Sequence, residues 1–277
     1  MARAHDPDRP PLGLRVYTWA YFAWWFLPIA IVVRASFTSG DSPTQLEGFS
    51  WGWYEAALHD EEFRTSLVQS VRLAASTTAI ALPLGVATAI GLHRWRSRTA
   101  DAGGLLVLIA LAVPQTVLAA GLFLFLIQTP LLFGTTTQLL GHVTLAVPFV
   151  VVVVWVALAS VPRVHEESAM DLGATQAAAL MRVIFPQVLP ALVAAAAVAW
   201  LLSFDNIVVS SWLCIRSDCA TLPMRIYGRG GARAHPILYA YGSIGLAFTL
   251  GVAALATPWL IRAVRHGTSG PRRSVVG

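Results

Sequence analysis

The sequence predicts an all-α integral membrane protein with six transmembrane helices. Of its 277 residues, 56% are hydrophobic and only 12% are charged, whereas a soluble domain usually carries about 25% charged residues. Several uncharged runs reach the roughly 20 apolar residues that a helix needs to cross a bilayer. The arginines gather at the ends of these runs. The sequence pI of about 9.8 therefore indicates membrane topology rather than nucleic-acid binding.

The N-terminal part contains one span and a polar segment. Residues 1–15 form a proline-rich arm in which we expect no helix. The first span is expected at about 16–33. It is aromatic and no small-residue cleavage site follows it, which favours a retained helix over a signal peptide. Within the acidic segment 35–64, Trp51–Leu58 predicts a short amphipathic helix on the membrane surface.

Five further spans follow this segment. They are expected at about 72–92, 103–127, 141–161, 187–204 and 237–261. The third and fourth lie in the stretch 102–162, which contains no formal charge. Pro83, Pro114 and Pro148 fall inside expected spans. A proline there either marks a kink or is tolerated because neighbouring groups satisfy the freed backbone, and both interpretations stay open.

Six spans place both termini on one side of the membrane. That side, which includes the loops 94–101 and 163–182, holds twelve arginines and six acidic residues, against seven and eight on the other side. Because basic residues favour the cytoplasm, both termini and the 163–182 loop are predicted to be cytoplasmic. Arg225, Arg229 and Arg233 are the exception. They fall outside, either in a long loop that escapes the rule or as a docking cluster.

The stretch 163–186 is polar and lies between two long apolar runs. It carries acidic residues, small residues, a glycine and a proline where the chain re-enters the membrane. These residues are Glu166, Glu167, Ser168, Ala169, Asp171, Gly173 and Pro186. Carboxylates can bind a partner's arginines through charge-assisted hydrogen bonds, and glycine permits a sharp backbone turn. The stretch therefore predicts a docking surface, and an ordinary polar loop with a capped helix is the alternative.

This stretch resembles the EAA loop of binding-protein-dependent ABC transporter permeases. That loop reads Glu-Ala-Ala, then glycine, then Ile-x-Leu-Pro. Here Glu167–Ala169, Gly173 and Val183–Pro186 stand in these places, with Ser for Ala, Val for Ile and Phe for Leu. The resemblance implies a type I ABC importer permease in the inner membrane. It also implies three kinds of partner: ABC ATPase subunits on the coupling loop, a second permease subunit, and an extracytoplasmic substrate-binding protein.

The resemblance covers most of the chain and implies a division into four parts. These are a cytoplasmic arm (1–15), the first transmembrane helix with its outer loop (16–64), the permease core (65–264) and a cytoplasmic tail (265–277). All 19 basic residues are arginines, and a Walker A loop needs a lysine. We therefore expect no ATPase site in this chain, which would be a transport subunit and not an enzyme. The histidines are scattered without metal-ligand spacing, so no metal or other cofactor is expected in this chain. ATP and Mg²⁺ would be bound by the partner ATPase subunits.

A second similarity concerns the outer end of the fifth span. Ser203–Ser211 and Leu222–Tyr227 resemble the C-type subunit of spermidine/putrescine permeases, which implies a polyamine substrate. The similarity is less specific, because permeases for iron, phosphonates and opines share versions of it. These solutes and amino acid derivatives are therefore the alternative substrates.

Four residues near this end are candidates for the substrate pathway. Asp205, with Asn206 beside it, would attract a polycation, or it is an interfacial carboxylate that caps a helix or pairs with an arginine. Trp212 and Tyr227 are candidates for cation–π contact with ammonium groups. The alternative for both is an ordinary place at the membrane interface.

Cys214 and Cys219 are the only cysteines, and both fall on the predicted outer side. An oxidising exterior permits a disulfide between them, and two free thiols are the alternative.

A standalone membrane protein is the alternative class, either a proton- or sodium-driven carrier or a membrane-embedded enzyme. Carriers usually contain internal repeats and charged residues near the membrane midplane. The uncharged stretch 102–162 and the lack of catalytic or metal-binding motifs argue against both.

Overall fold

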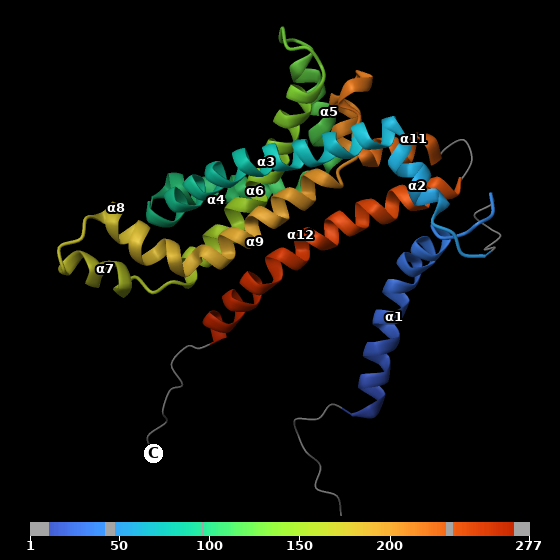
Figure 1. Ribbon diagram of the computed structural model, residues 1–277. Coiled ribbons are helices and arrows are strands. Elements are labelled where there is room, and N and C mark those ends of the chain that lie inside the picture. The colour runs from blue at the N-terminus through green and yellow to red at the C-terminus, as the bar shows by residue number, and fades with distance from the viewer. Residues whose placement is uncertain (1–10, 42–47, 96, 231–234, 269–277) are drawn as a thin grey trace, which may run out of the picture. The chain divides into compact units, whose positions relative to one another are not determined.

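The computed structural model describes residues 11–41, 48–95, 97–230 and 235–268. These residues form helices and connecting loops with no β-strand among them, which confirms the all-α prediction (Figure 1). The chain divides into two compact units. One contains Met1–Glu61 and Gly228–Ile244, and the other contains Glu62–Tyr227 and Gly245–Gly277.

Five helical runs in the described part of the chain are long and apolar enough to cross a membrane. They are α1 (Leu12–Ala35), α3 (Glu61–Arg94), α6 (Thr135–Ser160), the run Gln176–Phe204 and α12 (Pro236–Thr268). A sixth span exists if the bent pair α4 (Arg98–Ala112) and α5 (Gln115–Leu126) counts as one. The expected six spans therefore include this pair as the third.

The remaining helical segments are shorter. They are α2 (Gly52–His59), α7 (Val164–Asp171), α8 (Gln176–Ala179), the π-helix η1 (Leu180–Ile184), α9 (Phe185–Phe204), α10 (Val208–Leu213), the 3-10 helix η2 (Ser217–Cys219) and α11 (Leu222–Gly230). Of these, α8, η1 and α9 follow one another without a break and form the apolar run that begins at Gln176. Helix α2 confirms the predicted short helix after the first span.

The expected third span is not a straight helix, because α4 and α5 are bent by 103°. Val113 ends α4 in an extended conformation with ψ of 123°, and Pro114 follows it. A proline ring disfavours the helical conformation of the residue before it, so the break falls at this pair. Pro83 and Pro148, by contrast, lie inside the helices α3 and α6. The helix is therefore broken at Pro114, whereas α3 and α6 continue through Pro83 and Pro148.

Helix α1 begins at Leu12, so the expectation of no helix before residue 16 is wrong for residues 12–15. Pro11 occupies the N-cap position, and its carbonyl accepts a hydrogen bond from the Arg15 N–H at 3.2 Å. Proline is well tolerated at a helix start, because its missing N–H is not needed there. The expected arm at residues 1–10 lies outside the described residues.

The first unit contains an aromatic cluster beside the C-terminal end of α1. The ring of Phe37 lies edge-on to Trp51 with centroids 4.8 Å apart, and its centroid is 4.9 Å from that of Tyr54. The hydroxyls of Tyr54 and Ser36 are 2.7 Å apart and share a hydrogen bond. These contacts join α2 to the end of α1.

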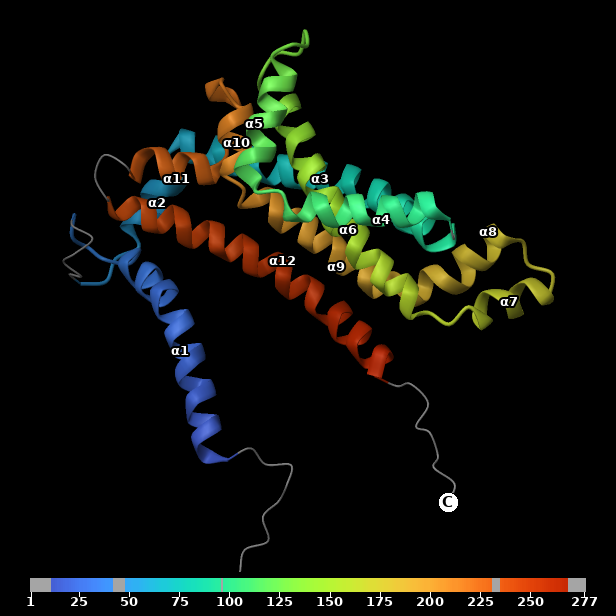
Figure 2. The same ribbon diagram turned by 180° about the vertical axis from the view of Figure 1, so that it is seen from behind.

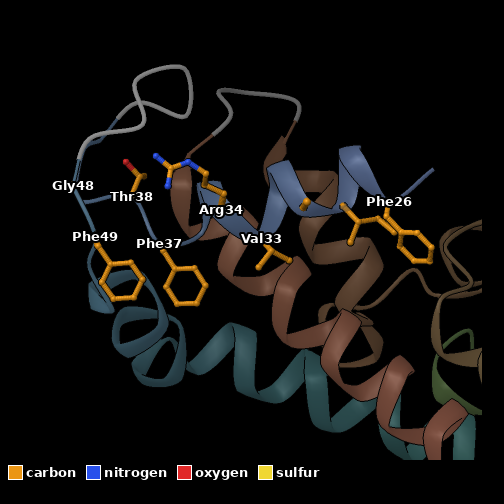
Figure 3. A pocket seen from close by; sticks show the side chains of 9 residues that line it. Phe26, Val33, Arg34, Phe37, Thr38, Gly48 and Phe49 are labelled. Carbon is orange, nitrogen blue, oxygen red and sulfur yellow. The ribbon is translucent and has the colours of Figure 1, made fainter. Parts of the chain in front are cut away.

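An open cavity of about 490 Å³ runs along one face of α1 in the first unit. Figure 3 shows Phe26 and Val33, two turns apart on this face, with Phe37 and Phe49 side by side at its end. The lining residues are Phe26, Ile29, Ala30, Val33, Arg34, Phe37, Thr38, Gly48 and Phe49. No residue in the most apolar part of α1 is buried within the chain. The first unit itself therefore leaves this part of α1 uncovered.

Two of the arginines that contradict the charge rule form ion pairs. In the first unit, a guanidinium N–H of Arg229 donates to the Asp60 carboxylate at 2.8 Å, and the Tyr241 hydroxyl donates to the same carboxylate. In the second unit, Arg225 donates to Glu62 at 3.0 Å. Both charges are thus paired within the protein, which argues against an arginine docking cluster at these positions. The third arginine of that hypothesis, Arg233, lies outside the described residues.

The core of the second unit is built mainly by α6 and α9, with α3 beside them (Figure 2). Val150 and Val154 of α6 and Ala195 and Ala199 of α9 are buried in one cluster. Small residues allow membrane helices to approach closely. At Gly85 of α3, an added Cβ would lie only 2.7 Å from the Val150 Cβ, so the close contact requires glycine.

Candidate functional site

The polar stretch forms a helical pair at the start of the fifth expected span. In Figures 1 and 2, α7 and α8 lie next to each other, joined by a short loop, and η1 leads from α8 into α9. None of the residues of α7 is buried. The predicted loop therefore presents a short exposed helix, which is the geometry that a docking surface needs.

Gly173 makes the turn that ends α7. Its φ is +91°, a conformation that glycine adopts much more readily than other residues. The Gly173 N–H donates to the Met170 carbonyl at 2.9 Å, and the Ala174 N–H donates to the Ala169 carbonyl at 3.0 Å. These two bonds are the pattern of a Schellman motif. The glycine of the EAA-like pattern is therefore the residue that reverses the chain from α7 toward α8.

The two adjacent glutamates have different surroundings. The Glu166 carboxylate is half-buried and accepts a hydrogen bond from the guanidinium of Arg94, the last residue of α3. The prediction placed Glu166 among the carboxylates offered to a partner, but its carboxylate is already bound within the chain. Glu167 and Asp171 are exposed and lie four residues apart, on the same face of α7.

The other residues of the predicted loop complete the exposed surface. Ser168 is exposed and Ala169 is half-buried. Leu172, which the sequence analysis did not single out, has 90% of its surface exposed directly before Gly173. An apolar side chain so exposed at a helix end is suited to a pocket on another protein.

Pro186 lies at the start of α9, immediately after the π-helix η1. Proline cannot donate a backbone hydrogen bond, and its ring clashes with the carbonyl four residues earlier. That carbonyl belongs to Arg182, which is inside η1. The wider π-helical turn relieves this conflict and lets the helix continue, and such turns occur frequently at functional sites.

A cavity lies at the other end of α9, where the helix stops at Phe204. Its volume is about 460 Å³. Its walls are made of two amides, one carboxylate and several aliphatic side chains. The lining residues are Gln115, Val198, Leu201, Leu202, Asp205, Asn206, Ile207 and Val208. The chain thus has a mixed polar and apolar cavity next to the candidate Asp205.

Asp205 and Asn206 have different roles in this cavity. The Asn206 side chain accepts a hydrogen bond from the Val209 N–H at 2.8 Å and donates to the Gln115 amide oxygen at 3.0 Å. It therefore supports the start of α10 and holds α5 to it. The Asp205 carboxylate has no ion-pair partner among the described residues and lies at the open side of the cavity. Burial of its inner side raises the pKa of Asp205.

The two candidate aromatics do not line this cavity. Trp212 packs edge-on against Phe123 with ring centroids 5.8 Å apart, and Tyr227 is 77% exposed on α11. The structure thus brings together Asp205 and Asn206 and adds Gln115, but it leaves Trp212 and Tyr227 elsewhere. Gln115 carries no signal in the sequence, because its partner is 91 residues away.

A buried polar network lies just before Asp205. His142 of α6 is 1% exposed, and its ring nitrogens are 2.8 Å from the Ser203 hydroxyl and 3.0 Å from the Ser210 hydroxyl. Ser203 in turn donates to the Thr77 hydroxyl of α3 at 3.2 Å. The network ties α3, α6 and α10 to the end of α9.

Cys214 and Cys219 are joined by a disulfide in the structure, with Cα atoms 5.7 Å apart. The bond closes the turn that contains η2. Its formation in the cell remains a prediction. Elsewhere in the described chain, no group of three or more histidine, cysteine or acidic residues could hold a metal ion.

Apolar helices of spanning length, with an exposed polar helix at one end of a span and a carboxylate cavity at the other, are compatible with a transport permease. The family comparison supports this class. A model of the binding-protein-dependent transport system inner membrane components matches residues 81–269, and the chain belongs to this family. Its members are inner membrane transport subunits, which confirms the predicted class and localisation.

Relatives that are named for the solutes they transport match this chain over most of their own length. The spermidine/putrescine transport system permease protein PotC of Haemophilus influenzae is 30% identical over 240 residues, covering 87% of this chain and 93% of the relative. The putrescine transport system permease protein PotI of Escherichia coli (strain K12) is 28% identical over 230 residues, covering 80% and 82%.

Solved structures share the fold. One chain of a bacterial ABC transporter involved in the import of the acidic polysaccharide alginate superposes with a TM-score of 0.73 at 15% identity, covering 90% of this chain and 94% of that one. A chain of an amino acid ABC transporter with histidines gives a TM-score of 0.60 at 16% identity, covering 76% and 98%. At such identities the similarity supports the predicted importer permease fold, not a substrate.

Proposed function

We propose that this chain is a pore-forming permease subunit of an ATP-driven importer for polyamines such as spermidine and putrescine. The observation that carries the proposal is the cavity at the end of α9, which is lined by aliphatic side chains and by Asp205, a carboxylate with no ion-pair partner among the described residues. Curated relatives that span almost the whole chain are named for spermidine and putrescine transport, and they point to the same substrate class.

The chemistry of the cavity fits a polyamine. A polyamine carries ammonium groups separated by methylene chains. Asp205 offers a negative charge for one ammonium group, and the amides of Gln115 and Asn206 offer further hydrogen-bond acceptors. Val198, Leu201 and similar side chains offer apolar surface for the methylenes. An iron, phosphonate or opine permease is the alternative, and a carboxylate with no basic residue in the cavity is poorly suited to an anion.

The partners follow from the family and from α7. The family is defined by dependence on a binding protein, and a solved alginate ABC transporter of the same fold was crystallised with a periplasmic protein bound. We infer that α7 docks on ABC ATPase subunits, which bind ATP and Mg²⁺, and that a second permease subunit completes the pore. For this docking, Leu172 supplies an apolar contact, and Glu167 and Asp171 supply two exposed carboxylates.

We also propose that α7 and both termini are cytoplasmic. The arginine distribution supports this orientation. Arg225 and Arg229 would lie on the outer side in this orientation, against the rule that basic residues favour the cytoplasm. They are paired with Glu62 and Asp60, so their positive charges count less against this orientation.

The substitution Asp205→Asn tests the substrate proposal. It keeps the shape of the side chain and removes its charge. Because a hydrogen bond to a charged group contributes about 1.5–3 kcal/mol, we expect polyamine uptake by the complete transporter to fall about 10-fold or more. Uptake of labelled spermidine into cells is the measurement, with Asp218→Asn, an exposed residue paired with Arg216, as the control. Wild-type uptake by Asp205→Asn would exclude this residue from the pathway.

A further inference from the structure

We propose that Arg94 is a positioning residue that fastens the docking helix α7 to α3, so that a push on α7 displaces α3 and α9 together. The proposal rests on the proposed docking of an ATPase on α7. It assigns the adjacent glutamates to two tasks. Glu166 binds inward to Arg94, and Glu167 faces the partner.

The ion pair joins distant parts of the sequence at a shielded place. Arg94 is the last residue of α3 and Glu166 lies in the first turn of α7, 72 residues later. Their side chains are 23% and 22% exposed, so water screens the pair less than it would screen a fully exposed one. Glu167, the next residue, is exposed and has no such partner among the described residues.

The pair lies over a nearly filled contact between helices. The space beneath it is only about 20 Å³, which is about enough for one water molecule. Apolar side chains of α3, α6 and η1 pack around it. They include Ile90, Leu158, Leu180 and Ile184. Such a packed contact transmits displacement, because protein interiors deform little.

Further contacts make α3, α7 and α9 one connected frame. His165 of α7 and Gln187 of α9 are 3.1 Å apart through their side-chain nitrogen and oxygen. At the far end of α9, Ser203 donates to Thr77 of α3. Helices α3 and α9 are thus linked directly near Asp205 and through α7 near Arg94. A displacement of α7 therefore reaches the cavity by two helices rather than by α9 alone.

A charge-swap experiment tests this role in the complete transporter reconstituted in proteoliposomes. The variants are Arg94→Glu, Glu166→Arg, both changes together, and Glu167→Arg as the matched charge reversal. Three quantities are measured: ATPase retained on purification, ATP hydrolysed, and spermidine taken up per ATP. We expect each single change at the pair to retain the ATPase but lower uptake per ATP about fivefold or more, the lower range of typical coupling between sites. The double swap should restore most of the uptake per ATP that the single changes lose.

The control separates the two proposals. Glu167→Arg should lose the ATPase itself, because it reverses a charge on the docking face. If neither this change nor Asp171→Arg alters ATPase retention or coupling, the proposed docking is wrong. Suppose instead that Glu167→Arg or Asp171→Arg does alter ATPase retention or coupling. The positioning role is then overturned if the single changes at Arg94 and Glu166 leave uptake per ATP unchanged. It is also overturned if the double swap takes up no more spermidine per ATP than either single change. Arg94→Lys keeps the positive charge and should retain more than half of the wild-type uptake per ATP. If Arg94→Lys lowers uptake per ATP as much as Arg94→Glu does, the positioning role of Arg94 is also contradicted.

Discussion

At the scale of single residues, neighbouring polar side chains have separate functions. Asn206 satisfies backbone and amide groups that hold the break between α9 and α10, whereas Asp205 keeps its carboxylate toward the cavity. Glu166 and Glu167 divide in the same way, one bound to Arg94 and one exposed. In both pairs, the residue with no ion-pair partner among the described residues is the one suited to an external ligand or partner.

The raised pKa of Asp205 predicts a pH dependence of transport. Its carboxylate attracts a polycation only when ionised, so the attraction is present above its pKa and is lost as the pH falls through it. Because burial raises this pKa above the ordinary value of about 4, the acid-side decline in uptake should begin at a higher pH than for an exposed carboxylate. Uptake measured against external pH should show this decline in the wild type and not in Asp205→Asn. If uptake by the wild type and by Asp205→Asn declines identically at acid pH, the proposed role of the Asp205 charge is contradicted.

The sequence could not assign these roles, although it identified most of the residues. Glu166 and Glu167 look alike until the fold brings Arg94 from α3 to one of them. Gln115 reaches Asn206 only because α5 turns away from α4 at Pro114. Trp212 and Tyr227 were candidates on proximity in sequence, but helices α10 and α11 carry them away from the cavity.

At the scale of helices, the spans follow from apolar length, and the ends follow from local chemistry. The bilayer requires about 20 apolar residues per span, so the uncharged runs were sufficient to predict the helices. The bend between α4 and α5 was not predictable from proline alone, since Pro83 and Pro148 leave α3 and α6 intact. The conformation of the residue before each proline makes the difference.

The turn after α7 gives a prediction at this scale. Gly173→Ala puts a side chain at φ of +91°, which costs about 1–2 kcal/mol and should loosen the Schellman turn. We expect less ATPase to co-purify with this variant, because α7 is no longer held against α8. Gly121→Ala is the matched control, since Gly121 lies inside α5 with nothing near an added Cβ and should behave as wild type. Equal ATPase retention by both variants would show that the turn is not needed.

At the scale of the whole molecule, the family membership and the exposed helices indicate a subunit that works together with other proteins. Among the described residues, α7 has no buried residue, and the most apolar part of α1 is not buried within its own unit. The family membership explains this, because a binding-protein-dependent system contains other components. The general class was predictable from composition and the 163–186 pattern. The pairing of Arg225 and Arg229 was not, because their acidic partners lie 163 and 169 residues earlier.

The central claim is that this chain conducts polyamines under the control of ATP hydrolysis. The most direct measurement is uptake of labelled spermidine into proteoliposomes that contain this chain with its second permease and ATPase subunits. We predict uptake that requires both ATP and the substrate-loaded binding protein, and that unlabelled putrescine reduces. Uptake without ATP, or no spermidine uptake by a complex that imports iron, a phosphonate or an opine, would contradict the account.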